Sequence, residues 1–181
     1  MKKIYVPMIF FLLLVLSACG PQFGQYTSQD QKFSAVMPDV KNVLTSCQTE
    51  NQVKSCMTFA SSQNVGFFIL SDQDLSGGAG QFAGANVASI ATTLAGSLCG
   101  FPLAPGLSRA TVVNQTLAIK SGNYPAAHFV GSSCPDGNPT EGYVFVANGM
   151  LYRIYVKGKN VGSADQETHI STFFSSFTTI P

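Results

Sequence analysis

Apolar and polar positions alternate along much of this chain, and the alternation predicts a β-sheet. In the segment 32–38, Phe33, Ala35 and Met37 fall on one face and Pro38 ends the run, as expected for a half-buried strand. The run 65–70 is mostly apolar without alternation, which predicts a strand buried on both faces. Further strands are predicted at 40–49, 52–60, 110–120, 123–132, 141–147 and 150–158.

The clearest local signal is a hairpin near the end of the chain. Asn148 and Gly149 separate two apolar arms, 141–147 and 150–158. A type I′ turn needs a positive φ at both central residues, and Asn-Gly is the pair that adopts this most easily. The sequence therefore predicts that these two arms are neighbouring antiparallel strands.

Two segments follow the helical period instead. At about 164–177, Ile170, Phe173, Phe174 and Phe177 recur at the spacing of one helix face, and Ser163 with Gln166 forms a capping box. At about 79–98, a second apolar stripe predicts a central helix; it consists of Val87, Ile90, Ala91, Leu94 and Leu98. Strands with two such helices predict an α+β fold, in which an antiparallel sheet carries helices on its faces.

The glycine-rich segment before the central stripe invites two other interpretations. Gly78, Gly80 and Ala83 satisfy the dinucleotide pattern G-x-G-x-x-A, but residues 71–76 separate them from the preceding strand. The acidic residue expected about twenty positions on is missing as well. A membrane segment is disfavoured because amides and hydroxyls would have to enter hydrocarbon. The sequence favours a packed helix.

The first twenty residues indicate export. Lys2 and Lys3 precede an apolar run too short for a membrane span and a small-residue exit, the pattern of a signal peptide. The run ends in Leu-Ser-Ala followed by Cys19, which resembles the lipobox of bacterial lipoproteins. The resemblance implies cleavage after residue 18 and acylation of Cys19, and several acyl chains hold a protein firmly to a bilayer. In the sorting rule that this resemblance suggests, Gly20 after the cysteine favours the outer over the inner membrane. We expect residues 19–27 to be the lipidated end and a tether, and 28–181 to be one domain.

The charge of the chain gives no support for nucleic acid as a partner. Without Lys2 and Lys3, the ten basic residues become eight, against nine acidic ones, and only 10% of the chain is charged. No basic patch or charged run points to nucleic acid.

Four cysteines remain after Cys19, and an even number in an exported chain predicts two disulfides. Three connectivities are possible. We favour Cys47 with Cys56, across neighbouring strands, and Cys99 with Cys134, which would tie the central helix to a later loop. A metal site is the alternative, but no C-x-x-C pair occurs and the only two histidines, His128 and His169, show no ligand spacing. We expect neither metal nor cofactor, and we interpret His128 as a hydrogen-bonded structural residue.

Three short segments carry a resemblance to a known family. YTSQDQKFSAVMP near the start, and LYRIYVKG and FFSSFTTIP near the end, resemble the ends of the PsbP-like family, a fold of an extrinsic photosystem II subunit and of many bacterial lipoproteins. The order of elements agrees over roughly 26–180. The resemblance implies an α/β/α sandwich and a role in binding or assembly. It brings no catalytic residue, and the four cysteines are not part of the family's pattern.

These observations predict a non-catalytic lipoprotein of the outer membrane. Its domain would face the periplasm and bind or assemble another envelope component, such as a secretion or transport complex. An alternative is a periplasmic protein that binds a small ligand or lipid in a cleft between the central helix and the sheet. The sequence shows no G-x-S-x-G motif, and neither histidine belongs to a recognisable catalytic motif, so we expect no enzyme.

Overall fold

The computed structural model describes residues 22–76, 82–100 and 110–181. Most strands of this part form an antiparallel sheet in the order β3-β4-β5-β9-β8-β7-β6. These strands are β3 (Leu44–Glu50), β4 (Val53–Ser62), β5 (Val65–Asp74), β6 (Ala110–Ile119), β7 (Gly122–Gly131), β8 (Thr140–Ala147) and β9 (Met150–Gly158). A smaller sheet has the order β1-β2-β10, with β1 (Phe23–Thr27), β2 (Phe33–Pro38) and β10 (Thr178–Thr179).

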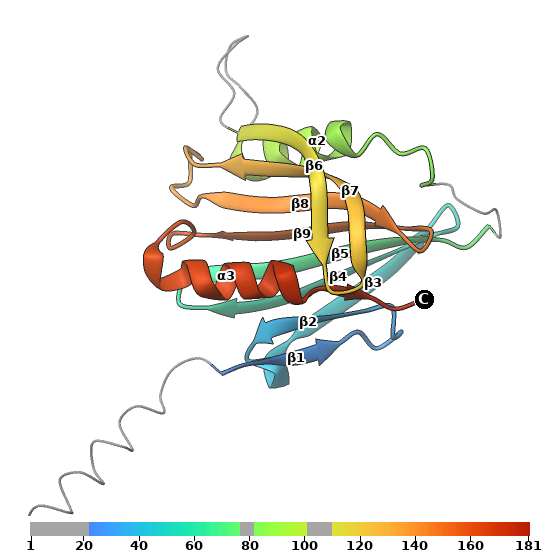
Figure 1. The fold of residues 1–181 in the computed structure, drawn as a ribbon, viewed down its shortest axis with the longest axis horizontal. Coiled ribbons are helices and arrows are strands. Elements are labelled where there is room, and N and C mark those ends of the chain that lie inside the picture. Colours follow the sequence, from blue (N-terminus) through green and yellow to red (C-terminus); the bar gives the residue numbers. More distant parts are fainter. Residues whose placement is uncertain (1–21, 77–81, 101–109) are drawn as a thin grey trace, which may run out of the picture.

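Two α-helices complete the fold, α2 (Val87–Cys99) and α3 (Ala164–Ser176). They lie on opposite faces of the large sheet, because α3 packs in the same cluster as the small sheet and α2 packs in another. In Figure 1 the small sheet lies at one end of the view and α2 at the other, with the large sheet between them. The predicted α+β fold with antiparallel strands is confirmed.

Tight turns connect several neighbouring strands. Asn148 and Gly149 have φ values of 50° and 73° between β8 and β9, so the predicted hairpin is confirmed. Asn51 and Gln52, between β3 and β4, take similar values of 49° and 64°. Both turns have the positive φ pair that matches the twist of antiparallel strands.

The face of the large sheet that carries α3 holds the main core. Its largest side chains have no more than 2% exposure, and they come from both sheets and from the end of α3: Phe33, Phe67, Phe145, Tyr152, Phe173 and Phe177. Burying a side chain of this kind contributes about 1.5–3 kcal/mol. The apolar residues of α3 recur at the helical period because one face of the helix packs in this core.

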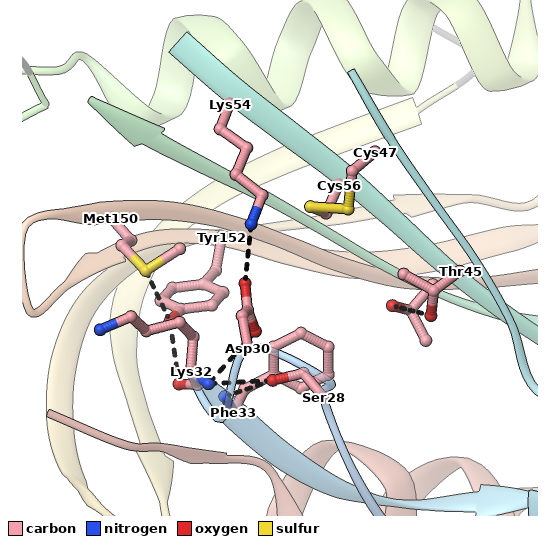
Figure 2. Close-up of polar contacts among 11 residues, drawn as sticks. Ser28, Asp30, Lys32, Phe33, Thr45, Cys47, Lys54, Cys56, Met150 and Tyr152 are labelled. Atoms are coloured by element: carbon pink, nitrogen blue, oxygen red, sulfur yellow. Dashed lines mark hydrogen bonds and ion pairs between the residues drawn. A yellow bond between two sulfur atoms is a disulfide. The ribbon is translucent and has the colours of Figure 1, made fainter. Parts of the chain in front are cut away.

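Polar contacts join the small sheet to the large one, and Figure 2 shows them. The Ser28 hydroxyl accepts a hydrogen bond from the Lys32 backbone N–H at 2.9 Å, which closes the turn before β2. The Tyr152 hydroxyl donates to the Lys32 carbonyl oxygen at 3.2 Å. Lys54 on β4 lies 3.7 Å from the Asp30 carboxylate. The two sheets are therefore joined at this turn by β9 and β4.

The structure corrects the prediction that residues 19–27 are a tether. Residues Phe23–Thr27 of that range form the strand β1, which pairs along β2 with Phe23 opposite Pro38 and Thr27 opposite Ser34. The pairing is carried by backbone hydrogen bonds, and the sequence FGQYT has no regular apolar alternation that would reveal it.

The strand predicted at 40–49 is also shorter. Val40–Asn42 form a 3₁₀ helix, and β3 begins at Leu44. Asp39 takes a left-handed conformation, and its carbonyl oxygen and carboxylate accept bonds from the Asn42 backbone and side chain. Such local bonds compete with strand pairing.

The central helix begins later than the predicted start near 79. Residues 77–81 lie outside the described part, Phe82–Gly84 form a turn, and α2 begins at Val87. Asn86 is its N-cap, and the Asn86 side chain accepts a hydrogen bond from the Ser89 N–H at 3.1 Å. The helix begins at this cap because the Asn86 bond stabilises the helix end, whereas each glycine included in a helix costs about 1 kcal/mol relative to alanine.

The last helix agrees with the prediction within one residue, but its capping box does not form. Ser163 occupies the N-cap position without a side-chain cap bond. Its hydroxyl donates instead to the Asn160 carbonyl oxygen at 2.7 Å. Within the described residues, no helix combines the length and apolar character needed to cross a membrane.

Candidate functional site

The helix α2 covers only part of its face of the large sheet. Its main contacts are with β6, β7 and β8, and side chains of β9 and β5, such as Tyr155 and Phe68, pack in the same cluster. The closest packing uses small side chains, Ala91 and Ala95, against buried residues such as Phe129 and Tyr155. The same face of β3, β4 and β5 extends beyond this contact, and we call that part the open face. It comprises Leu44, Ser46, Gln48, Ser55, Met57, Leu70, Asp72 and Arg153.

An ion pair forms the floor of the open face. Arg153 on β9 donates from Nη2 to Asp72 Oδ2 on β5 at 2.5 Å, and the two residues are 81 positions apart in sequence. The strand register explains the contact, since Arg153 lies opposite Leu70 and Asp72 lies opposite Leu151. The two charged groups are thus diagonal neighbours on adjacent strands. The Asp72 side chain is 10% exposed and that of Arg153 is 23% exposed.

Each member of this pair keeps an unused hydrogen-bonding atom. Asp72 Oδ1 and Arg153 Nε are buried and have no hydrogen-bond partner in the described structure. An unpaired buried group costs about 1–3 kcal/mol, and more when it is charged. The ion pair on the floor is therefore buried with incomplete hydrogen bonding.

The walls around the ion pair contain both polar and apolar residues. They enclose a groove of about 420 Å³ whose lining includes the polar residues Ser46, Ser55 and Gln48. At its side, Met57 and Leu44 are 45% and 66% exposed. Exposed apolar side chains beside hydrogen-bonding groups are typical of surfaces that bind other molecules.

The four predicted cysteines form two pairs, and Cys56 of one pair is among the residues that line the groove. The sulfur atoms of Cys47 and Cys56 are 2.11 Å apart, and those of Cys99 and Cys134 are 2.07 Å apart. These are disulfide distances, in the pairing favoured from sequence. Cys47 lies directly opposite Cys56 and secures β3 to β4 (Figure 2). Cys19 lies outside the described residues.

The histidines have structural contacts. His128 Nε2 lies 3.0 Å from Glu141 Oε1, and its ring stacks on Tyr143, so its interpretation as a hydrogen-bonded residue is confirmed. The His169 ring stacks on Phe23. In the described ranges, no cluster of three potential ligands from His, Cys, Asp and Glu could hold a metal ion.

Sequence reasoning missed the ion pair, although a signal was present. Arg153 interrupts the apolar run MLYRIYV, and Asp72 follows FFILS. Charged residues inside apolar strands are rarely buried without a partner. That rule marks both residues but does not pair them, because their proximity depends on β5 and β9 being neighbours.

Tyr155, beside Arg153 on β9, has a pKa above the ordinary tyrosine value. Burial raises the pKa of Tyr155, and the positive charge of nearby Arg153 lowers it by a smaller amount. The ring of Tyr155 stacks on Phe68 with centroids 4.7 Å apart. Tyr155 therefore separates the α2 contact from the open face as a neutral, packed side chain.

Comparison with known proteins concerns the fold. No family model matches the sequence, and neither does any curated protein. The solution structure of cyanobacterial PsbP (CyanoP) from Synechocystis sp. PCC 6803 is similar, with a TM-score of 0.54 and 9% identity over 90% of this chain and 96% of CyanoP. A protein of unknown function from Pseudomonas aeruginosa has a TM-score of 0.41 and 9% identity, over 88% of this chain and 99% of that chain. The similarity to CyanoP shows that this chain has a PsbP-like fold.

Proposed function

We propose that this chain is a lipid-anchored protein of the bacterial outer membrane, with its domain in the periplasm, that binds another envelope protein through the open face. One observation carries the binding role: the open face contains a groove with a largely buried ion pair on its floor, beside exposed Met57 and Leu44. A partner that covers this surface would fill the groove and bury the side chains of Met57 and Leu44.

The anchor rests on the lipobox-like sequence that ends at Cys19. The strand β1 begins at Phe23, four residues later, and an extended chain spans at most about 3.6 Å per residue. The start of β1 would therefore lie within about 14 Å of the acylated cysteine. Because β1 packs on the α3 side of the large sheet, the open face on the other side would stay accessible to a periplasmic partner.

The alternative, a small-ligand cleft between α2 and the sheet, has less support. The described contact between them is filled by buried side chains, including Ala91, Ala95, Phe129 and Tyr155. We therefore place binding on the open face, and the role we propose is non-catalytic assembly of an envelope complex.

Affinity purification of the tagged full-length chain from detergent-solubilised membranes tests this proposal. We expect wild type in the membrane fraction with a co-purifying envelope protein, identified by mass spectrometry. Met57→Glu places a charge on the open face and should reduce that protein at least about tenfold, since a desolvated like or unpaired charge costs several kcal/mol. Cys19→Ala should move the chain to the soluble fraction.

The matched control is Leu75→Glu, because Leu75 is similarly exposed, at 49%, and lies just beyond β5. This variant should retain the partner. Equal recovery of the partner with Met57→Glu and wild type would contradict the open-face proposal. A Cys19→Ala chain that stays in the membrane fraction would contradict the anchor independently.

A further inference from the structure

The strand β3 forms one edge of the large sheet. Over Leu44–Glu50 it pairs with β4 on one side, and no other described strand pairs with its outer side. Its sequence LTSCQTE contains no proline and a single charge, at Glu50. Charges and prolines are the usual means by which proteins block an edge strand, so β3 keeps a nearly unprotected edge.

Both faces of β3 are accessible as well. All of its residues are exposed except Thr45, which is partly covered and whose hydroxyl lies 3.0 Å from the Tyr26 hydroxyl. The disulfide between Cys47 and Cys56 holds the strand against β4. A second strand can therefore pair with β3 without the cost of first ordering it.

The turn between β3 and β4 determines which backbone groups face outward. Asn51 and Gln52 form a two-residue turn, and such a turn is closed by a hydrogen-bonded pair, here Glu50 with Val53. Hydrogen-bonded and non-hydrogen-bonded pairs alternate along an antiparallel ladder. The N–H and C=O groups that face outward therefore belong to every second residue of β3: Thr45, Cys47 and Thr49.

These three residues are arranged symmetrically about Cys47. When two copies of β3 run antiparallel about a two-fold axis at Cys47, Thr45 of each copy lies opposite Thr49 of the other. Every outward N–H then meets an outward C=O group, because a hydrogen-bonded pair exchanges both of its bonds. A register shift of one residue would place outward groups opposite inward ones, and a shift of two would shorten the paired segment.

The side chains in this register are compatible too. Ser46 lies opposite Gln48 of the other copy, so a hydroxyl faces an amide across the seam. Polar cross-strand pairs stabilise a ladder, whereas like charges directly opposite destabilise it. The single charge of the strand, Glu50, lies opposite Leu44, which keeps the two Glu50 carboxylates at opposite ends of the seam. The strand is therefore complementary to itself.

From these observations we propose that two copies of this chain associate edge to edge through β3 and form one continuous antiparallel sheet. Each copy contributes the same strand, as in the two-fold interfaces of most homodimers. An axis perpendicular to the sheet places both open faces on one side and both small sheets on the other. This arrangement is compatible with the proposed lipid anchor next to β1, but the dimer requires neither the anchor nor an envelope partner.

Sedimentation equilibrium of the purified full-length chain tests the proposal, in a detergent matched in density by the buffer so that only protein mass is measured. We expect a monomer–dimer equilibrium that reaches twice the mass of one chain. Thr49→Pro removes an outward N–H and keeps the bonds to β4, since proline is tolerated on the free side of an edge strand, so this variant should be monomeric. The matched control, Thr49→Ala, keeps the N–H and should dimerise like wild type.

Charge variants test the register, and they use the exposed positions Ser46 and Gln48. Ser46→Lys with Gln48→Lys places like charges directly opposite in two pairs and should raise the Kd of the dimer at least about tenfold. Ser46→Lys with Gln48→Glu places opposite charges in the same two pairs and should keep the dimer. Circular dichroism of each variant checks that the monomer is folded.

Three results would overturn the proposal: a wild-type chain that stays monomeric, a dimer that persists in folded Thr49→Pro, or equal Kd values for the two charge variants. Each is measured on the purified chain alone. The outcome is therefore independent of whether the open face binds an envelope protein.

Discussion

At the scale of single residues, Lys157 connects three parts of the molecule. Its ammonium group lies 2.8 Å from Asp136 Oδ2 in the loop after β7 and donates to the Leu98 carbonyl oxygen at 2.5 Å. That carbonyl belongs to the last turn of α2, where the helix dipole favours a cation. The Asn138 N–H also donates to Asp136. These hydrogen bonds, first that of Lys157, lower the pKa of Asp136 from 3.8 to about 2.

Replacing Lys157 with methionine should raise the pKa of Asp136 part of the way back toward 3.8, because the Asn138 bond remains. The folded pKa is lowered, so the pair stabilises the native state above pH 3.8 and the effect is lost as pH falls through about 2. A carboxyl NMR titration measures this directly. Lys54→Met, which breaks the separate contact with Asp30, is the control and should not move Asp136. An unchanged Asp136 pKa in Lys157→Met would contradict the assignment.

At the scale of elements, two hairpin turns share one geometry but differ in sequence. The β8–β9 turn is Asn148-Gly149, and the β3–β4 turn is Asn51-Gln52, all four residues with positive φ. A residue with a Cβ pays about 1–2 kcal/mol in the left-handed region, whereas glycine does not. The β3–β4 turn therefore carries a local cost that the β8–β9 turn avoids.

We expect Gln52→Gly to stabilise the protein by about 1 kcal/mol, measured by denaturant unfolding. The reciprocal change, Gly149→Ala, should destabilise by a similar amount. A Cβ at Gly149 would meet nothing within 4 Å, so any loss would come from the backbone conformation alone. Destabilisation by Gln52→Gly would show that the Gln52 side chain contributes more than the turn strain.

At the scale of the whole molecule, the two disulfides restrain different parts of the chain. Cys47 and Cys56 are 9 positions apart and connect adjacent strands, while Cys99 and Cys134 are 35 positions apart. Cys99 is the last residue of α2, and Cys134 follows β7. The second disulfide therefore anchors the helix that covers part of the large sheet.

Replacing Cys99 and Cys134 together by alanine should cost about 4 kcal/mol of unfolding free energy, against about 3 kcal/mol for Cys47 and Cys56 together, because the longer loop restricts the unfolded chain more. Denaturant unfolding of both double variants under identical conditions measures the order. Amide exchange in α2 should increase in the first variant and stay unchanged in the second. The reverse order of stability would contradict this account.

The sequence by itself determined the features that depend on neighbouring residues. The Asn148-Gly149 turn, the strands around it and the stripe of α3 follow from local backbone preference and periodicity, and they appear in the structure. The start of α2 was predicted too early because apolar spacing does not reveal that the Asn86 cap outweighs the glycines before it. The strand β1 was missed because its signal is pairing with β2.

Only the tertiary structure decided which distant segments meet. Sequence allowed three disulfide connectivities and favoured one of them, and the tertiary structure brings the sulfur atoms of that one together. The open face exists because, within the described residues, the main contacts of α2 are with β6, β7 and β8 and none of these main contacts is with β3 or β4. Asp72 and Arg153 became a site because β9 returns beside β5. Local periodicity specifies which face of an element is apolar, but contacts between distant elements arise from how those faces are buried together.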